Sequence, residues 1–146
     1  TFTFGGIELV SRLVDGAYPD YQQIIPQQTP TKVVVATREL NTATKGASLF
    51  ARSGIFDIML DVKPDQKEVE ISATSGQLGQ NTTKLDAVIT GEGNSIALNY
   101  RYLLDGLQNI ASEQVELGII DASSPCLITP NTKGAEYLYL IMPIKQ

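Results

Sequence analysis

The chain has no histidine, no tryptophan and a single cysteine, Cys126, among its 146 residues. Without histidine, neither a Ser-His-Asp nor a Cys-His nucleophile system can be assembled. One thiol and no imidazole also exclude a histidine-based zinc site and a thiolate cluster. A lone cysteine cannot form an intrachain disulfide, which fits a reducing cytoplasm. With no base to activate it, Cys126 is expected to be a buried structural thiol.

Long apolar runs are also missing. The longest, Val33–Ala36 and Leu138–Met142, are far shorter than the roughly 20 residues that a membrane-spanning helix needs. The segment Thr1–Gly6 lacks an initiator Met and the charged start and apolar stretch of a signal peptide, and it alternates like the interior of a strand. We therefore expect a cytoplasmic protein whose printed sequence begins inside something larger.

What is present describes a globular chain. Apolar residues make up 42% and charged residues 18%, which is enough apolar surface to form a core. A length of 146 residues suits one domain with a fragment of a neighbour. Lysine and arginine number 11 and aspartate and glutamate 16, so the net charge is −5.

The first 30 residues differ from the rest. Thr1–Phe4 and Ile7–Leu13 predict a β-hairpin, with Gly5-Gly6 as its turn. Pro26 argues against regular structure, and the polar stretch Gln27–Pro30 is typical of a linker. We therefore place a domain boundary here, with residues 1–26 belonging to one unit and residues 27–146 to another.

From residue 31 onward the order β-α-β-β-β occurs twice. Two such units can place two helices side by side on one face with antiparallel sheets outside, which predicts an α+β fold. The alternative is a chance similarity of two α+β stretches. The expected elements are a strand at 31–36, a helix at 38–52 capped by Thr37 and ended by Gly54, strands at 57–63, 68–73 and 83–90, a strand at 95–98, a helix at 99–110, and strands at 114–120, 126–129 and 137–142.

The acidic residues give little support to an enzyme. Asp57 and Asp61 share one face of a predicted strand about 13 Å apart, too far for one metal ion. A solvated strand face explains them, although a carboxylate-based hydrolase using these two residues is the enzyme alternative. Gly76–Gln80 lies between two strands and opens no helix, so it fails as a phosphate-binding loop.

The basic residues are segregated. Arg38, Lys45 and Arg52 are spaced by seven, so on one helix they stay on one face, drifting by about 20° per heptad. Arg101 lies away from the apolar side of the second predicted helix. A plain solvated face is one interpretation. The other is weak contact with phosphates that does not read the base sequence.

Three motifs stand in an order and spacing that cover essentially the whole chain. They are Ser11-Arg-Leu-Val-Asp-Gly-Ala-Tyr-Pro-Asp-Tyr21, then Asn99-Tyr-Arg-Tyr-Leu-Leu-Asp105, and finally Ser124-Pro-Cys-Leu-Ile128 with Tyr139-Leu-Ile-Met-Pro-Ile144. Together they resemble the bacterial β sliding clamp family, the β subunit of DNA polymerase III. The first is similar to the segment joining that family's middle and last domains, the second to a helix of the last domain, and the third to its C-terminal end.

The resemblance implies a fold and a function. In this family the last domain is the β-α-β-β-β unit twice over, three such domains form a subunit, and two subunits close head-to-tail into a ring. The ring encircles duplex DNA and tethers the replicative polymerase, the clamp loader and other partners. It is a processivity factor that catalyses nothing itself, and it uses no cofactor, metal or membrane.

The resemblance also assigns site residues. Arg38, Lys45, Arg52 and Arg101 would face DNA, and Leu49 and Phe50 with the edge strand near 82–89 would form the subunit interface. Partners would dock a peptide with a Gln head and a Leu-Phe-like tail. The matching cleft positions are Pro19, Gln23, Ile24, Ile55, Asn99, Tyr102, Ser124, Cys126, Leu140, Ile141, Met142, Pro143 and Ile144.

Some features depart from the family pattern. Gln22-Gln23 stands where basic residues are common, and Lys145-Gln146 replaces an arginine-containing end. The first domain and most of the middle domain are absent, so half of the peptide cleft is missing and we expect a C-terminal fragment. The alternative function is an independent α+β ligand-binding domain with its pocket under Tyr102 and Met142.

Overall fold

The computed structural model describes residues 1–18 and 20–145, so Pro19 lies outside the described residues. Its elements follow the predicted order, with β-α-β-β-β occurring twice from Thr31 onward, and the α+β class is confirmed. They are β1 (Phe2–Phe4), β2 (Ile7–Leu9), η1 (Tyr21–Gln23), β3 (Thr31–Ala36), α1 (Thr37–Ser48), β4 (Asp57–Lys63), η2 (Pro64–Gln66), β5 (Glu68–Ser75), β6 (Gly79–Thr90), β7 (Asn94–Asn99), α2 (Tyr100–Gln108), β8 (Gln114–Ile119), β9 (Cys126–Pro130) and β10 (Tyr139–Ile141).

The first strand of each repeat pairs with a strand of the other repeat. The main sheet has the order β10-β9-β8-β3-β6-β5-β4-β7, with every neighbouring pair antiparallel. Strand β3 of the first repeat pairs with β8 of the second from Thr31 to Ala36, and β7 of the second repeat pairs with β4 of the first. Because β3 also pairs with β6 of its own repeat, it joins the two repeats into one sheet, and β7 extends the far edge of the first repeat's strands.

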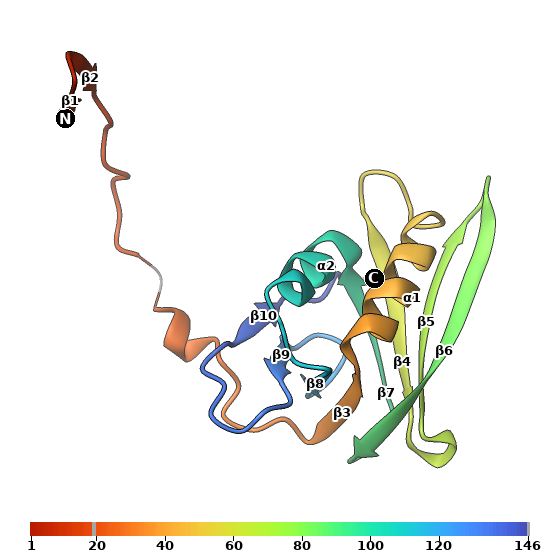
Figure 1. The fold of residues 1–146 in the computed structure, drawn as a ribbon. Helices are drawn as coiled ribbons and strands as arrows, with labels where there is room; N and C mark the ends of the chain where they lie inside the picture. The colour runs from red at the N-terminus through yellow and green to blue at the C-terminus, as the bar shows by residue number, and fades with distance from the viewer. Residues whose placement is uncertain (19, 146) are drawn as a thin grey trace.

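Helices α1 and α2 lie side by side on one side of this sheet (Figure 1). Their apolar faces carry Leu40 and Ala47 on α1 and Leu103 and Leu107 on α2, which are buried with the inward side chains of the strands. The strands alternate as predicted, because successive side chains of a strand point to opposite faces. One continuous core therefore lies between the helices and the sheet.

The start of α1 differs from the prediction. The helix begins at Thr37, and Ala36 occupies the N-cap without a side-chain hydrogen bond, so Thr37 is not the cap. Instead, the Thr37 hydroxyl donates to the carbonyl of Ser112 at 2.8 Å and the Thr37 N–H donates to that of Glu113 at 2.9 Å. A contact between the two repeats therefore replaces the local cap.

The end of α1 also differs. The helix stops at Ser48, not at Arg52 before Gly54. The carbonyl of Arg52 accepts hydrogen bonds from the N–H groups of Ile55 at 3.2 Å and Phe56 at 2.9 Å, and its guanidinium binds Asp57. Residues 52–57 thus close a turn of their own, and this turn competes with continuation of the helix.

The second helix is shorter than 99–110. It runs from Tyr100 to Gln108, and the Asn99 side chain accepts from the N–H of Arg101 at 2.9 Å as an N-cap.

Strands β5 and β6 are longer than predicted, because their pairing continues out to Ser75 and Gly79 around a tight turn. Strand β10 is shorter than 137–142.

The N-terminal hairpin extends away from the body (Figure 1). Gly5 and Gly6 have φ of 54° and 81°, the left-handed values that a two-residue hairpin turn requires, so the turn is confirmed. Strand β2 ends at Leu9, before the predicted Leu13. The apolar side chains of both strands are exposed, and Phe4 is 86% exposed.

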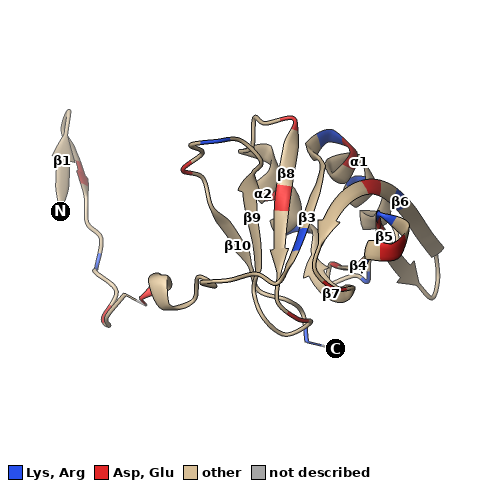
Figure 2. Ribbon diagram, turned by 90° about the horizontal axis from the view of Figure 1, so that it is seen from below, with Lys and Arg blue, Asp and Glu red and all other residues tan. Residues whose placement is uncertain are grey.

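Charged residues of both signs lie on the outside of the sheet (Figure 2). Lys32 on β3 pairs with Glu116 on β8 at 3.1 Å, which adds a charge contact between the two repeats. No helix among the described residues is long and apolar enough to cross a membrane.

Gly106 allows α2 to approach β10. A Cβ built on Gly106 would lie 2.6 Å from Cδ1 of Tyr139, so Gly106→Ala must displace that ring. We expect this variant to lower the free energy of unfolding by about 1–3 kcal/mol through overpacking, measured by chemical denaturation. The matched control is Gly46→Ala on α1, where the nearest atom is 3.8 Å away. An equal loss in both variants would contradict the overpacking explanation.

Candidate functional site

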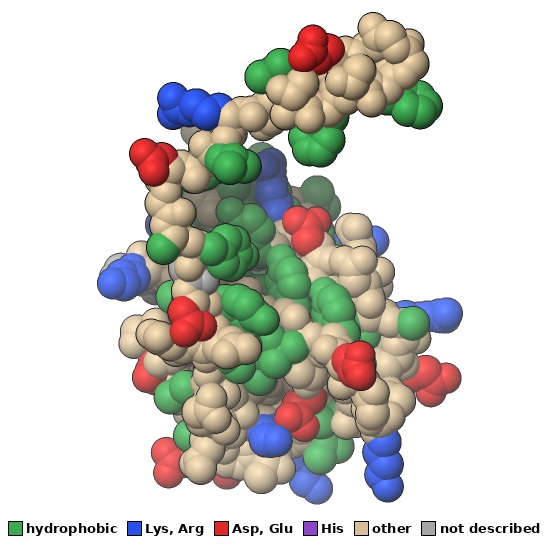
Figure 3. All heavy atoms as spheres, turned by 90° about the vertical axis from the view of Figure 1, so that its left-hand side faces the viewer, with side chains coloured by type: hydrophobic (Ala, Val, Ile, Leu, Met, Phe, Trp, Pro, Cys, Tyr) green, Lys and Arg blue, Asp and Glu red, His purple; other side chains and the backbone are tan. Residues whose placement is uncertain are grey.

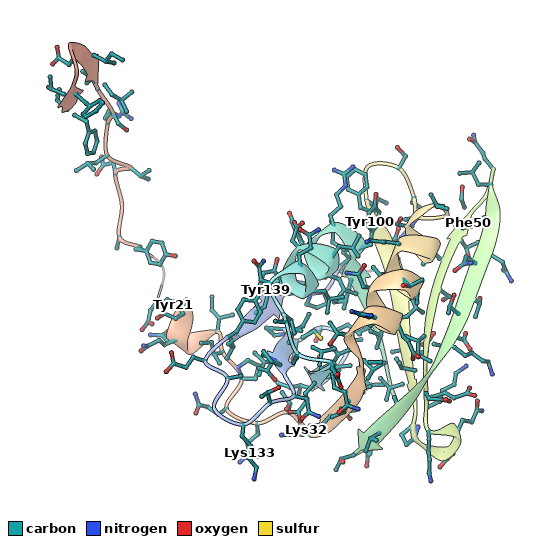
Figure 4. All side chains as sticks on the ribbon, in the orientation of Figure 1. Tyr21, Lys32, Phe50, Tyr100, Lys133 and Tyr139 are labelled. Atoms are coloured by element: carbon teal, nitrogen blue, oxygen red, sulfur yellow. The ribbon has the colours of Figure 1, made fainter. Side chains whose placement is uncertain are left out.

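The C-terminal segment borders an apolar hollow that the N-terminal segment helps to form. Its volume is about 390 Å³, and its walls come from two parts of the chain far apart in sequence. Hydrophobic side chains gather on the face that the N-terminal segment crosses (Figure 3), and Tyr21 and Tyr139 lie on the two sides of the hollow (Figure 4). The lining residues are Tyr21, Ile24, Ile25, Glu136, Leu138, Tyr139 and Leu140.

A second hollow lies further along the C-terminal segment. Ile55, from the turn after α1, and Ile144, from the chain end, line it together with Arg52 and Asp57. The backbone N–H of Ile144 donates to the carbonyl of Ala97 on β7 at 2.8 Å. The segment that follows β10 is therefore tied to the opposite end of the sheet.

Four of the predicted cleft residues line these two hollows. Ile24 and Leu140 line the first hollow, and Ile55 and Ile144 line the second. Tyr102 and Met142 are each 56% exposed. The first hollow is lined mainly by apolar side chains, whereas the second combines Ile55 and Ile144 with charged and polar groups, and apolar walls with a few polar groups suit a peptide anchor.

Other predicted cleft residues serve as supports. Cys126 is 0% exposed and Ile141 is 2% exposed, so neither presents surface to a ligand, and both back the wall from inside. Asn99 caps α2, and the Gln23 side chain donates to Asp20 at 3.0 Å. Pro143 is half-buried, while the prediction for Pro19 falls outside the described part of the chain.

Ser124 is held by a carboxylate that the sequence analysis missed. Asp121 accepts four hydrogen bonds, from the backbone N–H groups and the hydroxyls of Ser123 and Ser124, at 2.7–3.0 Å. These donors lower the pKa of Asp121 to about 2. An aspartate followed two residues later by Ser-Ser is a recognisable turn signal that could have identified it.

Tyr21, Ile25, Leu138 and Tyr139 were also missed as lining residues. Tyr139 stacks on Tyr137 with ring centroids 6.4 Å apart, and the Tyr137 hydroxyl donates to the carbonyl of Gly106 at 3.0 Å. Nothing local in the sequence indicates this arrangement, because it depends on α2 approaching β10.

Burial defines the chemistry of Cys126. Its desolvation raises the pKa of the thiol to about 12, so the thiol remains protonated and unreactive at neutral pH. The structure therefore agrees with the expectation of a structural thiol.

The four predicted DNA-facing cations have three different surroundings. Arg38 and Lys45 are exposed on α1, and their side chains have no acidic partner among the described residues. Arg52 lies beyond the end of α1, so the prediction that it continues the heptad face is wrong. Its Nε donates to both Asp57 carboxylate oxygens, at 3.1 and 3.0 Å, and this contact lowers the pKa of Asp57. Arg101 lies over the Phe56 ring, with Cζ 3.6 Å from the ring centroid.

Leu49 and part of β6 form an exposed edge beside α1. Leu49 is the C-cap of α1 and is 70% exposed, whereas Phe50 packs partly against the core. Residues 79–86 of β6 pair with β5 on one side and have no partner on the other side among the described strands. Ala87 to Thr90 pair with β3, so the free edge is shifted from the predicted 82–89.

The family model described as "DNA polymerase III beta subunit, C-terminal domain" matches residues 22–145. Among curated proteins, the chain is 30% identical over 144 residues to the beta sliding clamp of Synechocystis, covering 99% of this chain and 37% of that protein. It is 36% identical over 138 residues to the beta sliding clamp of Bacillus subtilis, covering 92% of this chain and 36% of that protein. The chain thus spans little more than a third of the length of these relatives.

Solved structures agree with this match. The DNA polymerase III beta subunit of Thermotoga maritima superposes with a TM-score of 0.84 at 31% identity, over 92% of this chain and 36% of that one. The sliding clamp of Bacillus subtilis gives a TM-score of 0.82 at 35% identity, over 93% of this chain and 36% of that one.

The hydrogen bonds to Asp121 predict a pH-dependent stability. Because its folded pKa of about 2 lies below the ordinary 3.8, the Asp121 carboxylate stabilises the fold above about pH 4, and this contribution is lost as the pH falls through 2. We expect the unfolding free energy of the unmodified chain to fall more steeply between pH 5 and 2 than that of Asp121→Asn, as measured by denaturation at each pH. The control Asp65→Asn removes an exposed carboxylate that accepts no hydrogen bond in the described structure. A variant Asp121→Asn with an unchanged pH profile would contradict the assignment.

Proposed function

This chain belongs to the DNA polymerase III β subunit family, the bacterial sliding clamps, as a C-terminal domain, and from this we propose that it works as the last domain of a ring that encircles duplex DNA. In that role it would confer processivity on the replicative polymerase without performing chemistry. The cytoplasm is the compartment that bacterial replication implies.

Peptide docking is supported by one observation: segments far apart in the sequence meet beside the C-terminal segment. The residues before β3 and those of β10 share one apolar hollow, and the turn after α1 and the chain end share the next. A short peptide with a Gln head and a Leu-Phe-like tail offers apolar groups for such hollows. The replicative polymerase and the clamp loader are the partners that would present it.

Residues 1–26 fit the role of the end of a middle domain that precedes residues 27–146. The register of the hairpin places the apolar side chains of β1 and β2 on one face, and they are exposed, with Phe2 69% and Ile7 71% exposed. Exposed apolar strands of this kind need a further sheet to cover them. A neighbouring clamp domain would supply that cover.

Arg38 and Lys45 support contact with DNA. They are unpaired cations on a helix of a chain whose net charge is −5. Such charges attract phosphates at any base sequence, and repulsion from the acidic remainder leaves the basic helix as the attractive surface. Weak contacts that do not read sequence are what sliding requires.

The free edge of β6 with Leu49 supports the homodimer interface of a ring. An unpaired strand edge of eight residues, Gly79–Asp86, is a template for pairing with another chain. A second subunit would cover both the edge and Leu49. The alternative of an independent ligand-binding domain is not favoured, because the relatives that match the chain are sliding clamps.

Met142→Ala tests peptide docking. Met142 is 56% exposed and lies in the segment between Leu140 and Ile144, which line the two hollows, so removing its side chain should weaken binding of a fluorescent peptide with a Gln head and Leu-Phe tail by roughly tenfold. Tyr102→Ala should have a similar effect. The measurement is a fluorescence anisotropy titration of the complete clamp, with Leu78→Ala as an exposed apolar control. Unchanged affinity in both cleft variants would remove them from the site.

Lys45→Glu tests the DNA-facing helix. Reversing this unpaired charge should shorten the retention of the complete ring on circular DNA, and it should leave peptide affinity unchanged. The control Lys133→Glu makes the same charge reversal on the loop between β9 and β10. An equal loss of DNA retention and peptide binding would indicate misfolding and contradict the role of Lys45.

A further inference from the structure

Phe56 lies next to Ile55 of the proposed peptide cleft, and its ring contacts Arg101 of the proposed DNA-facing surface. It has φ of 62°, a left-handed conformation that is strained for a bulky side chain. Such a conformation persists only where surrounding contacts hold it. The contacts of Phe56 therefore indicate which interactions depend on this conformation.

The backbone of Phe56 connects the turn after α1 to the start of α2. Its N–H donates to the carbonyl of Arg52 at 2.9 Å, which closes the turn. Its carbonyl accepts from the N–H of Tyr100 at 2.9 Å. Tyr100 is the first residue of α2, where N–H groups have no partner within the helix. Phe56 therefore satisfies one of these groups, and Asn99 satisfies the next.

The ring of Phe56 contacts the same helical turn. It meets Tyr100 edge to face, with ring centroids 5.9 Å apart and planes at 89°, and Tyr100 lies at the start of α2 beside the turn (Figure 4). The Arg101 guanidinium carbon lies 3.6 Å from the Phe56 ring centroid, a cation–π contact. The ring thus holds the direction of a side chain that is otherwise exposed.

This contact distinguishes Arg101 from the other exposed cations. Arg52 is bound to Asp57, whereas Arg38 and Lys45 have no side-chain partner in the described chain. Arg101 is held by an aromatic face and not by a carboxylate, so its charge is fixed in place without being neutralised. A guanidinium in this state can still bind phosphate.

We propose that Phe56 is a positioning residue that presents Arg101 to the DNA backbone. The proposal rests on the proposed function as a DNA clamp, and it assigns a role to a residue of the turn that the sequence analysis did not single out. A pre-positioned guanidinium loses less side-chain freedom on contact with phosphate than a freely rotating one.

The test separates the ring of Phe56 from its backbone. Phe56→Gly accepts the left-handed conformation and removes the ring, whereas Phe56→Tyr retains an aromatic face. In the complete clamp, we expect Phe56→Gly to weaken binding to a short fluorescent duplex at low ionic strength by about two- to fivefold, the factor for an exposed cation–π contact. Phe56→Tyr should bind as the unmodified protein does. Peptide affinity should change less than twofold in both.

Two further readouts exclude a general structural effect. The Arg101 side-chain protons should show an upfield ring-current shift in NMR spectra that Phe56→Gly abolishes and Phe56→Tyr keeps. In an Arg101→Met background, Phe56→Gly should cause no additional loss of DNA affinity, because both changes remove the same contact.

Several outcomes would overturn the assignment. They are unchanged DNA affinity in Phe56→Gly, an additive loss in the Arg101→Met background, or equal losses in Phe56→Gly and Phe56→Tyr. If Phe56→Gly also abolishes peptide binding, Phe56→Leu replaces it, and loss of peptide binding there too would show that Phe56 only supports the fold. An unmodified clamp that binds neither peptide nor duplex would instead refute the proposed function itself.

Discussion

The pairing of each repeat's first strand with the other repeat is the constraint on which the rest of the structure depends. Strand β3 hydrogen-bonds to β8 over six residue pairs, and β7 hydrogen-bonds to β4 over six. Strand β3 also pairs with β6 of its own repeat, so it joins the strands of both repeats into one sheet, and both helices lie against the same shared core. A hydrogen bond from Thr37 to the carbonyl of Ser112 ties the repeats together at a further point.

The proposed peptide cleft and the proposed DNA-facing surface both lie where segments of the two repeats meet. The turn at residues 52–57 follows the first helix, yet it satisfies the N-terminus of the second through Phe56. The C-terminal segment leaves β10 at one end of the sheet and bonds to Ala97 at the other. The proposed peptide cleft and the proposed DNA-facing helix surface thus share one support.

Much of the fold follows from the sequence pattern. The strand at 31–36, the strand at 57–63 and the repeated order of elements match the structure because apolar alternation and helical spacing are local signals. The errors occur where a distant contact competes with a local preference. Thr37 bonds to the second repeat instead of capping its own helix, and Arg52 turns toward Asp57 instead of extending the helix.

The sequence by itself determined the element types, the buried thiol and the family resemblance, since each depends on residue identity and short-range spacing. Only the tertiary structure decided which candidate residues are exposed and free to contact a ligand. It buried Cys126 and Ile141 away from any ligand, left Arg38 and Lys45 without an acidic partner among the described residues, and placed Arg101 on Phe56. The physical reason is that exposure and pairing arise from packing between segments far apart in the chain, which local patterns do not encode.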